Sequence, residues 1–242
     1  MAAIKEMDLV ARVRQRADME DNYFVSDIEV RDYINSGIAE LHDLLIQTYG
    51  QDYYVSSDTF NTTADQDTYP IASSTAGPNI TDFYKLRGMD AKLNGNDYFT
   101  LRPFNFNERN INQNGGASSV LGISNLRYRL VGSTIVFTPT PDTNTEIKIW
   151  YVPTAQQFSS TTPATSTTTF DDINGYGEYV VIDAAIKCLQ KEESDVSVLF
   201  AQKKDMKRRI EEAANNRDAG HPLSVSDIYL ENNEFFFGRS TS

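Results

Sequence analysis

The chain has 242 residues, 40% of them hydrophobic and 11% aromatic, which is enough to bury a core in one domain or in one domain with a large insertion. Its 34 acidic and 22 basic residues give a net charge of -12, which argues against a surface that binds nucleic acid or an anionic membrane. A single cysteine, Cys188, and two histidines exclude a disulfide framework and a zinc site, and no apolar run approaches the ~20 residues that span a membrane.

Two helices are predicted in the first 50 residues. The first covers 3–17, where apolar residues recur at intervals of three and four. Its early charges, from Lys5 onward, also argue against a secretory signal. The second runs from Ser26 to Tyr49, because Ser26 and Glu29 have the spacing of a capping box and Gly50 is a typical stop.

Residues 52–153 change to a period of two, which predicts β-strands. Turn residues at Asn94–Gly95, Gly132–Ser133 and Pro141–Asp142 join neighbouring strands, so an antiparallel sheet is expected. The long loop 105–122 is predicted to contact a partner, since loops of this length in compact chains are commonly functional. The Ser- and Thr-rich stretch from Ser159 is predicted to be a connector.

The third predicted helix follows the sequence INGYGEY, which superficially suggests a phosphate-binding loop. A dinucleotide fingerprint requires three glycines, and only Gly175 and Gly177 are present. We therefore interpret the stretch as a helix start capped by Asp171, Asp172 or Asn174. The helix is apolar around most of its circumference, which predicts burial inside the helical body or at a subunit interface. The residues of this packing or interface helix are Tyr179, Ile182, Ile186 and Leu189.

The fourth predicted helix covers 195–215. Its basic residues between Lys203 and Arg209 alternate with acids, so a solvated or salt-bridged face is expected rather than a nucleic-acid site. Its predicted inner face consists of Val196, Leu199, Phe200, Met206, Ile210 and Ala213.

The last segment, 221–242, is too short to form its own core but carries large apolar side chains that are costly to leave in water. Two alternatives remain open: it folds back on its own subunit, or it is an extended arm that orders on a partner. The apolar residues of this arm are Ile228, Tyr229, Leu230, Phe235, Phe236 and Phe237.

No catalytic signature is found in the sequence. It lacks the G-x-S-x-G and S-x-x-K patterns of serine nucleophiles. The stretches that begin at Asp65 and Asp142 faintly resemble cation loops, but neither matches the calcium loop with its glycine and final glutamate. The sequence therefore predicts a protein that is not an enzyme and that has no cofactor and no metal site.

The expected fold class is α+β. Residues 1–50 and 172–220 are predicted to form one discontinuous helical bundle, 51–171 an inserted antiparallel β-domain, and 221–242 an extended C-terminal arm.

Six motifs follow one another in an order that resembles the head-to-tail adaptor, or connector, proteins of tailed bacteriophages, especially the short-tailed kind, also called tail tubular or head-completion proteins. The resemblance covers nearly the whole chain. The motifs are FYKLRGMDAKLNG, LRPFNFNERN, YRLVGSTIVFTPTP, IKIWYVPTA, INGYGEYVVIDAAIKCLQKEESDVSVLFAQK and AANNRDAGHP.

This resemblance implies a structural protein of the virion neck, made in the host cytoplasm. Family members form a ring, commonly of twelve subunits, beneath the portal protein, extend the DNA channel and provide a docking surface for the tail nozzle. The family also implies that the 221–242 arm docks on portal. An acidic ring would let double-stranded DNA pass without sequence-specific binding, because a negative wall does not hold phosphates.

Two other functions remain as alternatives. The abundance of Tyr and Phe, 13 of each, and the long loop 105–122 are also typical of a ligand- or carbohydrate-binding β-domain on a helical stalk. An enzyme that acts on the cell wall is the third possibility, and it requires an essential acid that the sequence does not single out.

Overall fold

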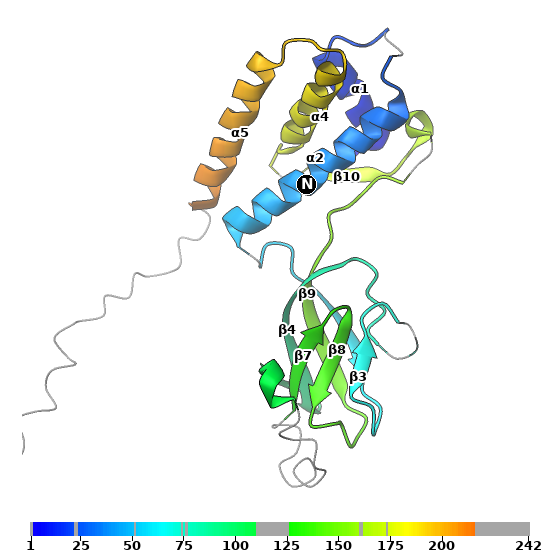
Figure 1. The fold of residues 1–242 in the computed structure, drawn as a ribbon, viewed down its shortest axis with the longest axis vertical. Coiled ribbons are helices and arrows are strands. Elements are labelled where there is room, and N and C mark those ends of the chain that lie inside the picture. Colours follow the sequence, from blue (N-terminus) through cyan, green and yellow to red (C-terminus); the bar gives the residue numbers. More distant parts are fainter. Residues whose placement is uncertain are drawn as a thin grey trace, which may run out of the picture.

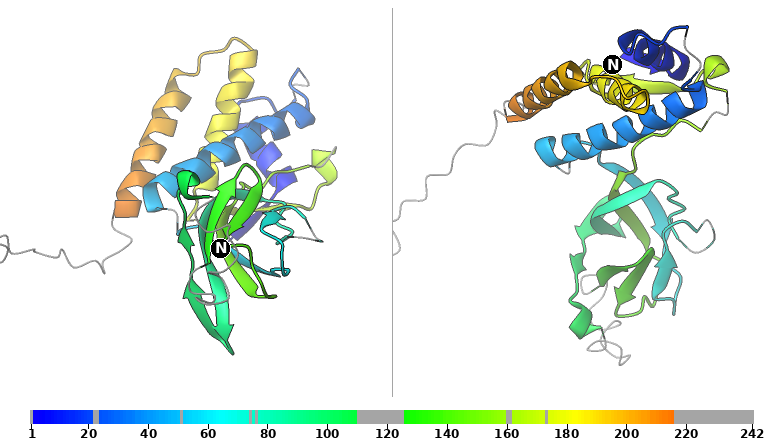
Figure 2. Two further views of the ribbon diagram at one scale, coloured as in Figure 1. Left: turned by 60° about the horizontal axis from the view of Figure 1, so that its bottom comes forward. Right: turned by 45° about the horizontal axis from the view of Figure 1, so that its top comes forward.

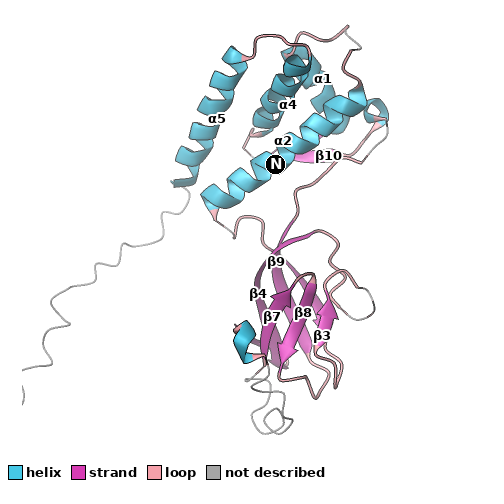
Figure 3. Ribbon diagram, viewed as in Figure 1, coloured by secondary structure: helices cyan, strands magenta, loops and turns pink. Residues whose placement is uncertain are grey.

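The computed structural model describes residues 2–21, 24–50, 52–73, 75, 77–109, 126–159, 162–172 and 174–215. Helices gather at one end of the molecule and two four-stranded sheets lie at the other (Figures 1 and 3). The predicted α+β class is confirmed. Segments 110–125 and 216–242, which contain most of the predicted loop 105–122 and all of the predicted arm, lie outside the described residues.

The chain begins with a strand rather than a helix. Strand β1 (Ala2–Lys5) pairs antiparallel with β10 (Thr169–Asp172), and α1 (Glu6–Arg16) starts only after it. The helix predicted from residue 3 was therefore wrong over its first turn. Its apolar spacing is compatible with a helix, but pairing with a strand more than 160 residues away decides the backbone of Ala2–Lys5.

Helix α2 (Asp27–Tyr49) has the predicted bounds. The Ser26 side chain accepts a hydrogen bond from the Glu29 N–H at 3.3 Å, and the Glu29 carboxylate accepts one from the Ser26 N–H at 2.9 Å, which confirms the capping box. Lys191 donates to the same carboxylate at 2.6 Å, and these hydrogen bonds lower the pKa of Glu29 to about 2. The ion pair between Lys191 of α4 and Glu29 thus links the N-terminal cap of α2 to α4.

Helix α4 (Gly177–Lys191) begins later than its predicted caps suggested. Its N-cap residue is Tyr176, which makes no side-chain cap bond. Instead, Asp172 at the end of β10 accepts a hydrogen bond from the Gly177 N–H at 2.7 Å. Asp172 therefore does satisfy a first-turn donor, but from the preceding strand, because the turn at 174–176 separates it from the helix. The last helix is α5 (Ser197–Asn215).

The β-rich part contains two sheets, ordered β2-β9-β4-β5 and β3-β8-β7-β6. All neighbours pair antiparallel as predicted, except β6 with β7, which is parallel. The predicted turns at Gly95 and Gly132 join β4 to β5 and β7 to β8, and both glycines have positive φ, 57° and 59°. The strands are β2 (Ser56–Asn61), β3 (Thr68–Pro70), β4 (Phe83–Asn94), β5 (Asp97–Thr100), β6 (Arg102–Pro103), β7 (Arg127–Val131), β8 (Thr134–Thr138) and β9 (Glu146–Pro153).

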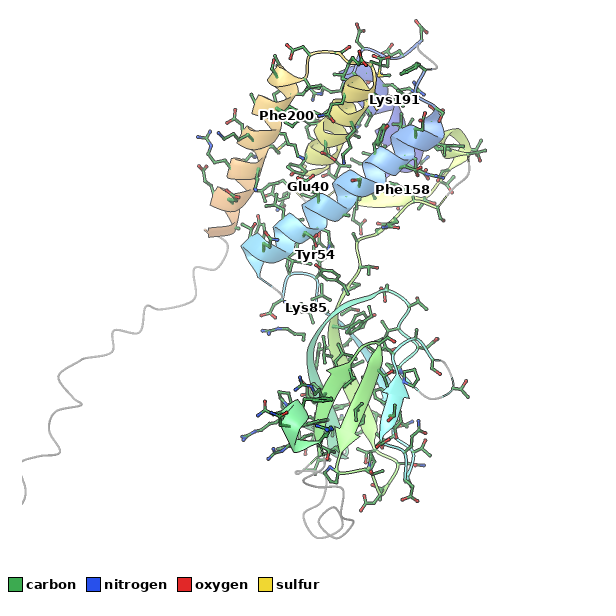
Figure 4. The ribbon with its side chains drawn as sticks, viewed as in Figure 1. Glu40, Tyr54, Lys85, Phe158, Lys191 and Phe200 are labelled. Carbon is green, nitrogen blue, oxygen red and sulfur yellow. The ribbon has the colours of Figure 1, made fainter. Side chains whose placement is uncertain are left out.

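Two separate hydrophobic cores hold the molecule together. One lies among the helices, and the other lies between the sheets around Met89, Ile135 and Ile149. The helical core also contains Phe158, which Figure 4 labels, and Phe170, and the sequence-based division places both in the β-insertion. We propose that the two parts are folding units and that the insertion ends near Pro153 rather than at residue 171.

The views of Figure 2 agree that α5 forms one edge of the helical part and packs beside α2 and α4. Two connections link the helical and β-rich parts, one after α2 and one after β9. The space between α2, α5 and the β9–β10 connection contains a large cavity.

Candidate functional site

Helix α4 is buried within the single chain. Tyr179, Ile182 and Ile186 are 1%, 4% and 3% exposed, and Leu189 is half-buried. Helices α1, α2 and α5 surround α4 on its different sides, and this accounts for its nearly continuous apolar surface. A contact of these residues with another subunit stays a prediction.

A close approach of α2 to α4 depends on Gly37. A Cβ atom at this position would lie 3.0 Å from an Asp183 carboxylate oxygen and 3.3 Å from Val180 Cγ1. A side chain at this position would therefore require Asp183 and Val180 to shift by a few tenths of an ångström.

The polar side of α4 contributes to a partly buried ion cluster. The side chain of Asp183 is 4% exposed, and it accepts hydrogen bonds from Lys187 at 2.6 Å and from Lys203 of α5 at 2.8 Å. Lys203 also binds Glu40 of α2, which accepts a further bond from the Tyr179 hydroxyl at 2.6 Å (Figure 4). Both carboxylates raise the pKa of Lys203 against the effect of its own burial. The cluster joins α2, α4 and α5.

Helix α5 contacts the rest of the chain through a narrow row of side chains. Ile210 is fully buried and Leu199 and Met206 are half-buried, as predicted. Phe200 and Ala213 were wrongly assigned to the inner face, since Phe200 is 47% exposed and Ala213 is exposed as well. Lys203 belongs to the face predicted to be solvated or salt-bridged, and its ion pairs with Glu40 and Asp183 match the salt-bridged alternative, although they place it in the contact row rather than opposite to it.

Substitution of Asp183 by asparagine is expected to lower the free energy of unfolding by roughly 3 kcal/mol, since it removes the anion that two partly buried ammonium groups share. The matched control is Asp205→Asn. Asp205 pairs with Arg208 on the outside of α5, and both side chains are exposed. This control should change the free energy by less than about 1 kcal/mol. Urea unfolding followed by circular dichroism measures both variants, and equal effects would contradict a structural role for the cluster.

An aromatic cavity of about 990 Å³ lies at the C-terminal end of α5. Arg209 and Ala213 of α5 line one side of it, and the residues between β9 and α4 line another. The remaining wall comes from α2 and the segment after it, and consists of Ile38, Leu41, His42, Leu45, Tyr49, Tyr53 and Tyr54.

The aromatic rings of this cavity contact one another. His42 stacks on Tyr54 with ring centroids 4.7 Å apart, and the hydroxyls of Tyr49 and Tyr176 lie 2.9 Å apart in a hydrogen bond. His42 is 8% exposed, and burial lowers its pKa, which favours the neutral imidazole. Its Nε2 has no hydrogen-bond partner among the described residues. No local sequence pattern indicates this cavity, because its walls come from distant segments.

Aromatic side chains of the β-rich part serve mainly its core, where Phe60, Tyr69 and Phe137 contact one another. Tyr98 and Trp150 lie on the outer face of the β2-β9-β4-β5 sheet. The Trp150 indole N–H donates to Asp90 at 2.6 Å, and Lys148 lies 4.2 Å from the ring centroid. These two rings of the outer face thus contact neighbouring side chains, while Tyr98 remains 41% exposed.

The described part of the chain contains no group of three or more His, Cys, Asp or Glu residues placed to hold a metal ion. The two stretches that resembled cation loops do meet, since the Asp65 N–H donates to the Pro141 carbonyl at 2.9 Å. Cys188 is buried, and burial raises the pKa of its thiol to about 11, which makes it a poor nucleophile. Among the described helices, none has the length and apolar character of a membrane span.

Comparison with protein families supports the resemblance seen in the sequence motifs. The family model of the SU10 adaptor protein matches residues 7–226, which covers both the helical and the β-rich parts. A comparison with curated proteins found no match. Because the family model spans most of the chain, the protein belongs to the SU10 adaptor protein family, whose role as a phage head-to-tail adaptor is structural.

Proposed function

We propose that the protein is a ring-forming head-to-tail adaptor of the virion neck. It docks beneath the portal, extends the DNA channel and offers an attachment surface to the tail nozzle. The family match over residues 7–226 is the observation that carries this proposal. The ring contains twelve copies, as the resemblance implies.

Helix α5 supports a ring built from identical head-to-tail contacts. It is the edge helix of the helical part, and Val198 and Phe200 remain 66% and 47% exposed on the two flanks of its contact row. A ring requires a heterologous interface, in which one face of a subunit meets a different face of the next. The outer surface of α5 supplies one such face, and the opposite edge near α1 supplies the other.

The acidic composition supports a DNA conduit. The net charge of -12 per chain gives a ring whose wall repels phosphates, so that DNA passes without being held. The β-rich part carries the contacts with the tail, and the loop 105–122 takes part in them, since long loops on a rigid scaffold are common partner-binding elements.

The mass of the protein in solution, with and without purified portal rings of the same phage, tests this function. An adaptor is expected to shift from its free mass to a portal complex with a fixed number of copies. A carbohydrate-binding β-domain would stay at its free mass and ignore the portal. Light scattering coupled to size exclusion measures both masses, and an unrelated ring-shaped protein serves as the control partner.

A further inference from the structure

The aromatic cavity lies where the C-terminal segment of the chain begins. Arg209 and Ala213 form part of its wall, and the described part of α5 ends at Asn215. In Figure 1, this end of α5 lies beside the C-terminal end of α2, which contributes Leu45 and Tyr49 to the same wall. Residues 216–242 therefore start within a few residues of the cavity.

The chemistry of the wall selects an apolar, preferably aromatic, occupant. Ile38, Leu41 and Leu45 provide an aliphatic side, and Tyr53, Tyr54 and Phe170 provide rings. His42 adds a stacked and neutral ring. A volume of about 990 Å³ is at the upper end of the range in which proteins hold ligands, so it can accept several large side chains together.

The C-terminal segment contains a matching group, the three consecutive residues Phe235, Phe236 and Phe237. For a random coil, the 22 residues from Ala213 to Phe235 correspond to a root-mean-square span of roughly 25 Å, so this length of sequence suffices to bring the group to a cavity that Ala213 itself lines. The short tether keeps its effective concentration in the millimolar range, which favours binding within one chain over binding between chains.

The charges of the C-terminal segment and of the cavity rim are complementary. The segment 221–242 contains Asp227, Glu231 and Glu234 against a single Arg239, whereas the exposed Arg209 stands at the rim of the cavity. Glu234 directly precedes the three phenylalanines, so their insertion brings a carboxylate toward that guanidinium group.

We propose that, in the free subunit, Phe235–Phe237 of the same chain occupy the aromatic cavity between α2, α5 and the β9–β10 connection. This selects the fold-back alternative for the unassembled protein and gives it a defined site. This proposal does not depend on whether the segment docks on portal. If the segment also docks on portal, the cavity shelters its phenylalanines until then, because exposed aromatic groups promote aggregation.

The pKa of His42, measured by titration, reports whether the aromatic cavity is occupied. The chain has only two histidines, and a chain that ends at Gly220 retains His42 alone, so its NMR signal is readily assigned. Phenyl rings in the cavity would further remove water from the imidazole and lower its pKa. The full chain is therefore expected to show a His42 pKa about half a unit or more below that of the shortened chain. Equal values in the two chains would overturn the proposal.

Two sets of substitutions in the full chain identify the occupant. Phe235→Ser, Phe236→Ser and Phe237→Ser together should reproduce the titration of the shortened chain. The matched set Ile228→Ser, Tyr229→Ser and Leu230→Ser should leave the full-chain titration unchanged. The reverse pattern would show that the wrong part of the segment was assigned.

Cross-linking distinguishes a chain's own segment from that of a neighbour. In a Cys188→Ala background, Gln156→Cys at the cavity and Phe236→Cys are expected to form a disulfide within one chain, at a yield independent of protein concentration. The control pairs Phe236→Cys with Asn61→Cys, an exposed position on β2, and should give little product. A cross-linked dimer whose yield rises with concentration would overturn the assignment to the same chain.

Discussion

Substitution of Val180 by aspartate is expected to prevent folding or to lower the free energy of unfolding by roughly 4 kcal/mol or more. Val180 is fully buried between α4 and α2, where its Cγ1 lies 3.3 Å from the position that a Cβ on Gly37 would take. A carboxylate at this position would be shielded from water. It would also lie one helical turn before Asp183, and the two lysines nearby, Lys187 and Lys203, already pair with Asp183.

Val180→Thr is the matched control, because threonine has nearly the same shape and adds a hydroxyl but no charge. We expect it to cost about 1–2 kcal/mol. Urea unfolding followed by circular dichroism, or the yield of soluble protein where unfolding cannot be measured, compares the two. A stable Val180→Asp variant would mean that α4 is not enclosed as described.

A buried charge is also tested at Ile182, one of the residues that the sequence assigns to the packing or interface helix. Ile182→Asp is expected to destabilise the protein less than Val180→Asp. Ile182 lies at the edge of the α4–α5 contact, in an open surface depression that Arg16 and Arg209 line together with Glu178 and Asp205, so a new carboxylate there is closer to solvent than one at Val180. The difference between the two variants thus tests how deeply each face of α4 is buried.

Removal of residues 221–242 is expected to leave the helical and β-rich parts folded but to abolish stable attachment to portal. Both hydrophobic cores of the described part are complete without the removed residues, so the two parts should stay folded, and the loss of Phe235–Phe237 from the aromatic cavity should only lower the temperature of unfolding. Attachment should fail, because the segment carries six large apolar side chains that would wrap the portal and contribute roughly 1.5–3 kcal/mol for each one buried.

Co-sedimentation with portal rings measures this loss, and thermal unfolding of the shortened chain is the control for its integrity. Wild-type affinity of the shortened chain for portal would assign docking to another surface. That outcome would not affect the cavity proposal, since the His42 titration is carried out without portal. Conversely, an unchanged His42 pKa would leave portal docking untouched.

Features encoded by neighbouring residues were predictable from sequence. The capping box of Ser26 and Glu29 and the stop at Gly50 define α2, because every group involved lies within one turn. The turns at Gly95 and Gly132 have the same local origin in positive φ. The burial of α4 follows from its periodic composition, and the family follows from the order of motifs along the chain.

Only the tertiary structure decided features that depend on distant partners. Residues 2–5 have helical spacing yet form β1, because β10 supplies the hydrogen bonds. Asp183 and Lys203 have the sequence pattern of wet residues, and only the crossing of α2, α4 and α5 encloses them as a cluster. The aromatic cavity likewise has no local signature: His42, Phe170 and Arg209 meet there only because three separate segments pack together, and its chemistry arises from that packing.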